Sequence, residues 1–437
     1  MPNEQTPLLR PSSHEGTNDH AQSHTHATGP VTVLSSLYAV WHTNRLFNVA
    51  LLVFVPLGIA SSKLGWSDTA VFALNFCAII PLAKMLDFST DQLAMRQGET
   101  VGGLLNATFG NAVELILSVF ALQENLFEVV KASMIGSILS NLLLVLGLCF
   151  LLGGLIPFER NKFQKFDVDR ANVSTGLLAL TFLGFLVPAA VQFVLDDGDV
   201  DKGDEVRRIV TLSRGISFIL FITYIAYLVF QLYTNPDGLL VTPKRSRSIT
   251  RFVTDLEQVT EEPESETESE EPVTLGWIAF LALGLSTLVI AVCAEILVGS
   301  IEGLSKEAQI SEVFIGIIIL PIVGNAAEHV TAVSSALRNK LDLSLQVAIG
   351  SAHQIALLVT PVVVLAGAFM NKDMDLDFGL FPTAVLFVSV LVVNALIQDG
   401  RTHWLEGWTL IVSYLIIALG FYFVPDSKSF VSAFGSK

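Results

Sequence analysis

The sequence predicts an all-α polytopic membrane protein of eleven transmembrane helices, one peripheral helix plus two inverted five-helix repeats. Three observations lead to this fold class. Hydrophobic residues make up 52% and charged residues 15% of the 437 residues, and the mean hydropathy is +0.61, which excludes an ordinary soluble domain. Apolar runs long enough to cross a bilayer recur along the chain. A polar motif inside one of these runs occurs a second time in the second half of the chain, and this repetition indicates an internal duplication.

The chain begins with a polar stretch, residues 1–45, which we predict to be a disordered cytosolic tail. Its first 30 residues have no apolar core and are therefore not expected to be a cleaved signal peptide. The four histidines in 1–30 allow metal binding as an alternative interpretation. A peripheral first transmembrane helix, 46–61, follows this tail.

Eleven apolar runs have a length that suits a membrane span. The first stands alone, five belong to a first repeat at 69–233, and five belong to a second repeat at 273–424. A cytosolic linker, 234–272, separates the repeats, and a short tail, 425–437, ends the chain. The predicted segments are 47–60, 69–86, 101–122, 129–155, 171–195, 212–233, 273–300, 313–337, 345–369, 380–397 and 405–424.

The formal net charge of −16 lies largely in the linker, where 255–271 holds nine acidic residues and no basic one. This stretch is either a disordered, solvated connector or an acidic helix that attracts or senses Ca²⁺. Lysines and arginines gather in the loops after the even-numbered segments. The positive-inside rule therefore places the N-terminus and the linker in the cytosol. No basic patch indicates a nucleic-acid partner.

The composition offers little sign of catalysis or of a bound cofactor. Cys77, Cys149 and Cys293 lie in apolar runs without the spacing of a metal site or a disulfide framework. No P-loop or phosphorylatable catalytic domain is visible, and the polar segments are too short to hold one. We therefore expect a protein that is not an enzyme and that has no resident cofactor.

The internal repeat is visible without gaps. A shift of 214 residues lays 101–147 on 315–361, and 13 of the 47 positions are identical. A shift of 211 residues joins the region 83–91 to 294–302. Because each unit has five segments, the two copies enter the membrane from opposite sides. Inverted repeats of this kind build secondary transporters, with the binding site near the midplane where the copies meet.

The repeated motif is Gly-Asn-Ala-x-Glu, at 110–114 and at 324–328. Each copy places a glutamate at membrane depth, which costs about 3 kcal/mol on insertion scales, so Glu114 and Glu328 must face protein, water or an ion. Asn111 and Asn325 are three residues before these glutamates, on the same helical face. We expect the two glutamates to converge. The helix-break residues, which would free backbone carbonyls near the site, are Ala107, Gly110, Pro321 and Gly324.

These residue types favour a divalent cation. Carboxylate, amide and backbone carbonyl oxygens are hard ligands, and Ca²⁺ takes about 6 to 8 of them in a flexible cage. Mn²⁺ would fit almost as well, whereas Na⁺ suits two negative charges less. Two close carboxylates can also take up protons when no cation is present, so Ca²⁺ and H⁺ would compete for the same oxygens. Interhelical hydrogen bonding is the plain structural alternative.

Further polar residues fall in neighbouring segments. One group would line the site, or would only let helices pack closely; it comprises Ser137, Ser140, Asn141, Ser351, His353 and Gln354. His353 and His329 could also relay protons. Three acids near segment ends are candidates for the ion pathway, or are simple interfacial charges, namely Asp91, Glu295 and Glu302. Lys84 stands at the position equivalent to Glu295 and breaks the symmetry.

At these residues the chain resembles the cation/proton exchanger (CAX) family of the calcium/cation antiporter superfamily, and is most similar to fungal vacuolar calcium/proton exchangers. The resemblance covers about 46–424 and rests on the motifs at 102–114, 324–329 and 347–352. It implies an eleven-helix exchanger with an acidic linker, in which segments two and seven slide against the core. It also implies that Glu114 and Glu328 are the shared ligands of Ca²⁺ and protons. Lys84 departs from the acidic residue expected at its position.

The function that we expect is secondary active Ca²⁺/H⁺ antiport, moving cytosolic Ca²⁺ into an acidic vacuole. Alternatives are a Na⁺-dependent or Mn²⁺-preferring exchanger of the same superfamily and a passive cation channel. The expected partners are Ca²⁺, H⁺ and the lipid bilayer, and the sequence leaves the oligomeric state open. A dileucine sequence at 4–9 resembles a sorting signal and suits a multi-pass protein of the vacuolar membrane.

Overall fold

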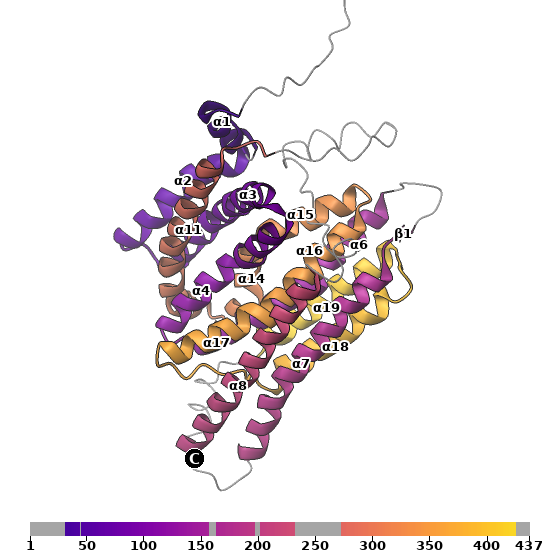
Figure 1. Ribbon diagram of the computed structural model, residues 1–437. Helices are drawn as coiled ribbons and strands as arrows, with labels where there is room; N and C mark the ends of the chain where they lie inside the picture. The colour runs from indigo at the N-terminus through magenta and orange to yellow at the C-terminus, as the bar shows by residue number, and fades with distance from the viewer. Residues whose placement is uncertain (1–30, 44, 157–162, 197–201, 232–271, 425–437) are drawn as a thin grey trace, which may run out of the picture.

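A computed structural model describes residues 31–43, 45–156, 163–196, 202–231 and 272–424. Residues 1–30, 232–271 and 425–437 lie outside the described residues, so the predictions made for them stay predictions. The predicted disordered tail ran to residue 45, and within it Val33–Thr43 form a helix. The described chain is almost entirely helical (Figure 1). Its one sheet pairs β1 (Gln164–Lys165) with β2 (Arg401–Thr402), antiparallel, with Gln164 opposite Thr402.

The helices fall into two sets that follow the predicted repeats. The first set is α1 (Val33–Thr43), α2 (Arg45–Lys63), α3 (Asp68–Phe109), α4 (Ala112–Gln123), α5 (Phe127–Leu139), the π-helical turn η1 (Ser140–Val145), α6 (Leu146–Leu155), α7 (Val168–Asp196) and α8 (Lys202–Val229). The second set is α11 (Gly276–Gly299), α12 (Ile301–Ala308), α13 (Glu312–Phe314), η3 (Ile315–Ile319), α14 (Leu320–Gly324), α15 (Ala326–Leu337), α16 (Leu341–Gln354), η4 (Ile355–Val359), α17 (Thr360–Phe369), α18 (Leu380–Ile397) and α19 (Trp404–Tyr422).

The duplication is confirmed by the helices themselves. α4 and α15 have bounds that differ by 214 at both ends, and so do α6 and α17. Two residues with positive φ stand at equivalent places after α4 and α15, Asn125 (φ 61°) and Asn339 (φ 56°). Asparagine tolerates this left-handed conformation better than most residues. The two copies therefore share their helix ends as well as their motif.

Membrane-crossing helices account for most of the described chain. Eight helices are long and apolar enough to span a bilayer, and ten do so if each of two bent pairs counts as one span. The shorter apolar helix α4 adds a further segment. Each of the eleven predicted segments coincides with helical structure. The segment 101–122 is nevertheless divided between α3 and α4, and 313–337 is divided between α14 and α15.

The link between predicted segments two and three is helical rather than an irregular loop. α3 runs for 42 residues and would be about 63 Å long if it were straight. It is not straight, because a Cβ on Gly102 would lie 2.8 Å from the carbonyl oxygen of Ala94. Eight residues span about 12 Å along a straight helix. α3 therefore turns sharply between these residues, so that the two predicted segments are separate in space.

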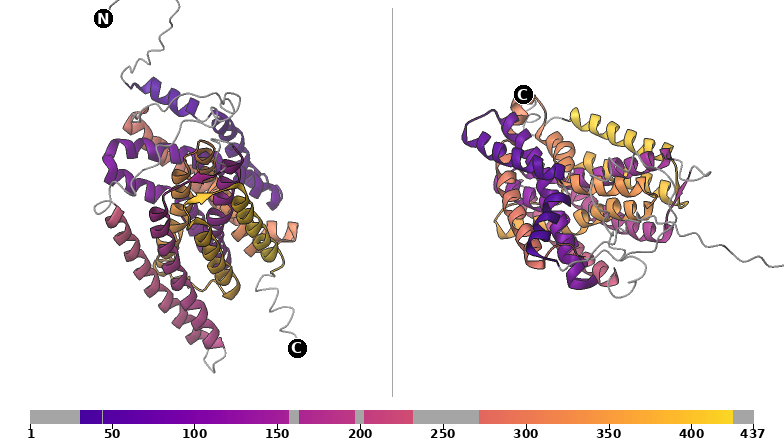
Figure 2. Two further views of the ribbon diagram at one scale, coloured as in Figure 1. Left: turned by 90° about the vertical axis from the view of Figure 1, so that its right-hand side faces the viewer. Right: turned by 90° about the horizontal axis from the view of Figure 1, so that it is seen from above.

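The second half makes the same turn by a different route. There the helix breaks at Gln309, whose φ is 55°, and the axis turns by 115° between Ile301–Ala308 and Glu312–Gly324. α3 packs along α2 and α11. These three helices form one flank of the molecule, beside a bundle that contains α6–α8 and α15–α19 (Figures 1 and 2). Fully buried apolar side chains lie in both parts, such as Ile79 and Ile290 in the flank and Leu146 and Ile355 in the bundle.

Candidate functional site

The first motif forms a break between two helices. α3 ends at Phe109, and Asn111 has non-helical torsion angles (φ −110°, ψ 29°). α4 then begins, and its first turn carries Glu114. Glu114 is 2% exposed, and neither of its carboxylate oxygens accepts a hydrogen bond from the described residues. A buried carboxylate without a donor is costly, so this side chain requires a cation or a proton.

The second motif repeats the break. α14 ends at Gly324, and Asn325 (φ −91°, ψ 10°) precedes α15, whose first turn carries Glu328. Glu328 is 9% exposed. Ala107 and Pro321, which we expected at the breaks, lie inside α3 and α14 instead. That prediction is wrong because alanine favours helix interiors, and because Pro321 closely follows the π-helical turn η3, a local adjustment of the kind that lets a membrane helix tolerate proline.

The two motifs meet at Gly324. A Cβ built on this glycine would lie 2.6 Å from Oε1 of Glu114, closer than any ordinary contact. The carboxylate of the first half therefore lies directly against the helix break of the second half. The reverse contact differs, because the nearest side chain of the second half to a Cβ on Gly110 is that of Gln354, whose Oε1 is 3.6 Å away.

A chain of hydrogen bonds joins the two halves beside these glutamates. Asn141 donates through Nδ2 to Oδ1 of Asn325 at 3.1 Å and to Oγ of Ser351 at 2.9 Å. Ser351 donates to Oδ1 of Asn111 at 3.2 Å, and Asn111 donates to Oε1 of Gln354 at 2.6 Å. Both motif asparagines are thereby oriented. Oδ1 of Asn141 is buried and accepts no hydrogen bond from the described residues.

Two backbone carbonyls near the breaks already accept hydrogen bonds. The carbonyl of Pro321 accepts from the backbone N–H and from Nδ2 of Asn325, both at 3.0 Å. That of Asn106 accepts from the N–H of Gly110 at 2.8 Å. Among the described residues no group of three or more histidine, cysteine or acidic side chains could hold a metal. The charged group at the breaks whose oxygens accept no hydrogen bond from the described residues is therefore the Glu114 carboxylate.

The comparisons with known proteins agree with this architecture. The sodium/calcium exchanger protein family matches residues 67–233 and 278–423, which cover nearly all of both repeats. The chain belongs to the sodium/calcium exchanger family.

Individual members of the family are similar over most of their length. The vacuolar calcium ion transporter of Schizosaccharomyces pombe is 42% identical over 381 residues, which are 87% of this chain and 85% of that protein. The Ca²⁺/H⁺ antiporter of Synechocystis is 41% identical over 382 residues, 87% of this chain and 98% of that protein. The crystal structure of the Ca²⁺/H⁺ antiporter protein YfkE has a TM-score of 0.69 and 35% identity, and covers 87% of this chain and 100% of that one.

Several predicted lining residues of this exchanger lie at the site. Asn141, Ser351 and Gln354 belong to the hydrogen-bond network. Ser140 lies 3.3 Å from Nε2 of His329, the residue after Glu328. Ser137 is 1% exposed on α5, one turn before the network.

Other predicted residues of the exchanger lie apart from the network. His353 is fully buried, and its ring centroid is 6.0 Å from that of Tyr227 on α8. Glu295 is exposed on α11. Glu302 pairs with Lys306 at 2.7 Å on the surface of α12, with the two side chains 63% and 73% exposed. Asp91 is half-buried on α3.

Two π-helical turns adjoin the site of the exchanger, and no residue pattern predicted them. η1 begins at Ser140, and η4 begins directly after Gln354. A π-turn inserts one extra residue into a helix and is frequent at functional sites. Here it shifts the helical face on which the following residues lie, immediately beside the polar groups that join the two halves.

Proposed function

We propose that this chain is a secondary active Ca²⁺/H⁺ antiporter that moves cytosolic Ca²⁺ into an acidic vacuole in exchange for protons. In this proposal access to Glu114 and Glu328 alternates between the two sides of the membrane. The observation that carries it is the buried Glu114 carboxylate, which lies against Gly324 of the opposite repeat with no hydrogen-bond donor. Two relatives, a vacuolar calcium ion transporter and a Ca²⁺/H⁺ antiporter, support the same cargo.

The oxygens available at the site suit Ca²⁺. The two glutamates supply charge, and the buried Oδ1 of Asn141 is a neutral oxygen still open to a ligand. Ca²⁺ accepts irregular cages with water in its shell, whereas Mg²⁺ demands near-octahedral geometry and dehydrates reluctantly. In this proposal Asn111 and Asn325 act mainly by orienting the breaks, because each Oδ1 already accepts one hydrogen bond. Mn²⁺ remains a second cargo that the same oxygens would accept.

Exchange follows from the cost of an empty site. An ionised Glu114, buried and without a hydrogen-bond donor among the described residues, is unfavourable in a low-dielectric interior. In this proposal either Ca²⁺ or protons neutralise Glu114, with Glu328 as the second ligand, before the site changes its exposure to the two sides. In the proposed cycle Ca²⁺ binds from the cytosol and leaves in the acidic vacuole, where protons replace it. The N-terminus and the acidic linker then lie in the cytosol, as the positive-inside rule indicates.

In this proposal the flank of α2, α3 and α11 moves to change which side of the membrane reaches the site. Hydrogen bonds join α3 to the segment α11–α12 near both ends of that segment. At one end Oε1 of Gln92 accepts from the N–H groups of Val273 and Thr274, at 2.9 and 3.1 Å. At the other end the carboxylate of Glu307 on α12 accepts from the N–H and the hydroxyl of Thr69, at 3.1 and 2.6 Å. In this proposal the pair moves as one body against the bundle.

The test is Ca²⁺ uptake into proteoliposomes under an imposed pH gradient. We expect wild-type uptake to be abolished by a protonophore, and Glu114→Gln and Glu328→Gln to lose it while remaining folded. Glu124→Gln is the matched control, because this exposed residue directly follows the last turn of α4. Substantial proton-driven uptake in either site variant would place the site elsewhere. Uptake driven by a sodium gradient but not by a pH gradient would favour a Na⁺-dependent exchanger, and uptake that never exceeds equilibrium would favour a channel.

A further inference from the structure

An ion pair is buried in the middle of α3. Nζ of Lys84 lies 3.0 Å from Oδ2 of Asp87, and the two side chains are only 14% and 11% exposed. The membrane-spanning part of α3 runs from Asp68 to Gln97, so Lys84 is about 24 Å from one end and about 20 Å from the other. Charged residues at this depth are rare and commonly mark an ion pathway.

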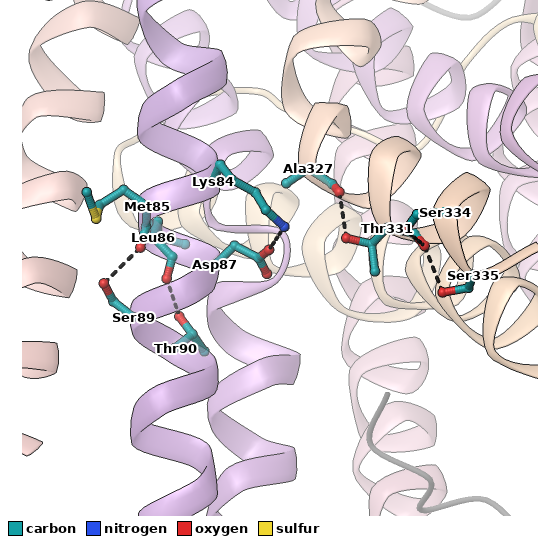
Figure 3. Close-up of polar contacts among 10 residues, drawn as sticks. All are labelled: Lys84, Met85, Leu86, Asp87, Ser89, Thr90, Ala327, Thr331, Ser334 and Ser335. Carbon is teal, nitrogen blue, oxygen red and sulfur yellow. Dashed lines mark hydrogen bonds and ion pairs between the residues drawn. The ribbon is translucent and has the colours of Figure 1, made fainter. Parts of the chain in front are cut away.

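The lysine points toward the helix that carries the second glutamate. Figure 3 shows Lys84 extending from α3 toward Ala327 and Thr331 of α15, and the two helices pack against each other. Ala327 directly precedes Glu328. A positive charge therefore lies at the α3–α15 interface, on the side of the residue that precedes Glu328.

The same interface is polar along its length toward Gln97 and Leu337. On α3, Lys84, Asp87 and Asp91 have the spacing of a single helical face. On α15, Thr331 and Ser335 are buried, and their hydroxyls donate to carbonyls of their own helix at 2.9 and 2.8 Å. Those donations leave the hydroxyl lone pairs available to a passing cation. We call these five residues the access seam.

Three of the five equivalent positions in the other half are apolar, whereas Lys84 and Asp91 pair with the exposed acids Glu295 and Glu302. The shift of 214 residues pairs Thr331 and Ser335 with Leu117 and Ala121, and the shift of 211 pairs Asp87 with Val298. These three apolar residues are at most 4% exposed. The fold therefore does not need polar groups at these positions. Their presence in only one of the two halves points to a role in the passage of ions.

We propose that Lys84 determines specificity for divalent over monovalent cations, because its ammonium occupies Asp87 in the access seam and a passing cation must displace it. A tethered ammonium has a high effective concentration at its partner. Na⁺ and K⁺ carry the same single charge as the ammonium, so their Coulomb attraction for the Asp87 carboxylate is no stronger than that of Lys84. Ca²⁺ has twice that attraction and can displace the ammonium. This inference rests on the proposed function, since the access seam leads to Glu328.

The test compares competition by monovalent ions among variants of the full-length protein in proteoliposomes. Ca²⁺ uptake under a pH gradient is measured with increasing Na⁺ or K⁺ on both sides, and the concentration that halves uptake is recorded. For Lys84→Met we expect this concentration to fall about tenfold, the effect of losing one modest ion-pair interaction. Lys84→Gln, which can still donate a hydrogen bond to Asp87, should show the same fall and covers the case in which Lys84→Met fails to fold.

Three further variants separate a role in specificity from one in packing. Lys84→Arg keeps the charge and should behave like wild type. Lys84→Met combined with Asp87→Asn removes both the resident cation and its carboxylate, so competition should return toward the wild-type value. Lys306→Met is the matched control, because it breaks an exposed ion pair with Glu302 outside the access seam.

The outcomes distinguish this inference from the proposed function. If the wild type shows no proton-driven Ca²⁺ uptake, the proposed function fails first. If the wild type transports Ca²⁺ but Lys84→Met and Lys84→Gln resist Na⁺ and K⁺ as well as it does, the inference is overturned and the proposed function stands. Increased competition in Lys84→Arg would equally overturn it.

Discussion

Replacing Gly324 with alanine tests the contact between the two repeats. The added Cβ would lie 2.6 Å from Oε1 of Glu114, 3.0 Å from its Cδ and 3.2 Å from its Cγ. Ordinary van der Waals contacts at such positions begin at 3.4 Å. The carboxylate must therefore retreat by the difference between 2.6 and 3.4 Å, which is 0.8 Å. Since Glu114 is a flexible side chain, it can move without unfolding the helices.

The size of this movement sets the expected effect. Ca²⁺–oxygen distances lie within a window of about 0.3 Å, between about 2.3 and 2.6 Å. A displacement of 0.8 Å exceeds this window, so at least one Glu114 oxygen would no longer lie at a normal distance from Ca²⁺. Disturbing the support of a metal ligand commonly costs about 10- to 100-fold in affinity. We expect the Ca²⁺ concentration for half-maximal uptake to rise by about that factor, with thermal stability almost unchanged.

The assay is Ca²⁺ uptake into proteoliposomes at a fixed pH gradient, over a range of Ca²⁺ concentrations. Gly215→Ala is the matched control, because a Cβ at this position in α8 meets no atom within 4 Å. Both variants should unfold near the wild-type temperature. An apparent affinity for Ca²⁺ within twofold of wild type in Gly324→Ala would refute the reasoning, since Glu114 would then not hold the ion at this contact.

Three further predictions concern stability and are checked by thermal unfolding of the purified protein in detergent. Asn339→Ala places a Cβ-bearing residue without a polar side chain at φ 56°, and should destabilise by about 1 kcal/mol, whereas Asn339→Gly should not. Lys131→Met removes a buried partner 2.7 Å from Asp375 and should cost about 3 kcal/mol, part of which Asp375→Asn should recover in the double variant. Glu307→Ala removes the acceptor for the N–H and hydroxyl of Thr69 and should lower the unfolding temperature, whereas Glu307→Gln should lower it less. An unchanged midpoint in any of the alanine or methionine variants would contradict the contact concerned.

Hydropathy and the internal repeat predicted the helices well, because both depend on residue type alone. The apolar runs located eleven helical segments, and the shift of 214 residues matched α4 with α15 to the residue. The two glutamates could be singled out because a carboxylate at membrane depth is costly whatever surrounds it. Their exact neighbours could not be foreseen, since the contact of Glu114 with Gly324 depends on how the repeats dock.

The helix breaks show where this reasoning stopped. Proline and alanine near the motifs were expected to mark the breaks, but Pro321 lies inside α14 and Ala107 lies inside α3. The break needs the non-helical torsion angles found at Asn111 and Asn325. The direction of a turn is equally hidden from composition, as in α3, where the chain reverses without leaving helical hydrogen bonding.

The positions of the π-helical turns indicate which features of the two halves are older than the duplication. η1 covers Ser140–Val145, and η4 covers Ile355–Val359, which lies within the image of η1 under the shift of 214 residues. An extra residue inserted independently at the same place in both halves would be a coincidence. The single ancestral unit therefore already contained this irregular turn before its gene was copied. η3 has no equivalent in α3, so the two halves came to differ at this turn after the duplication.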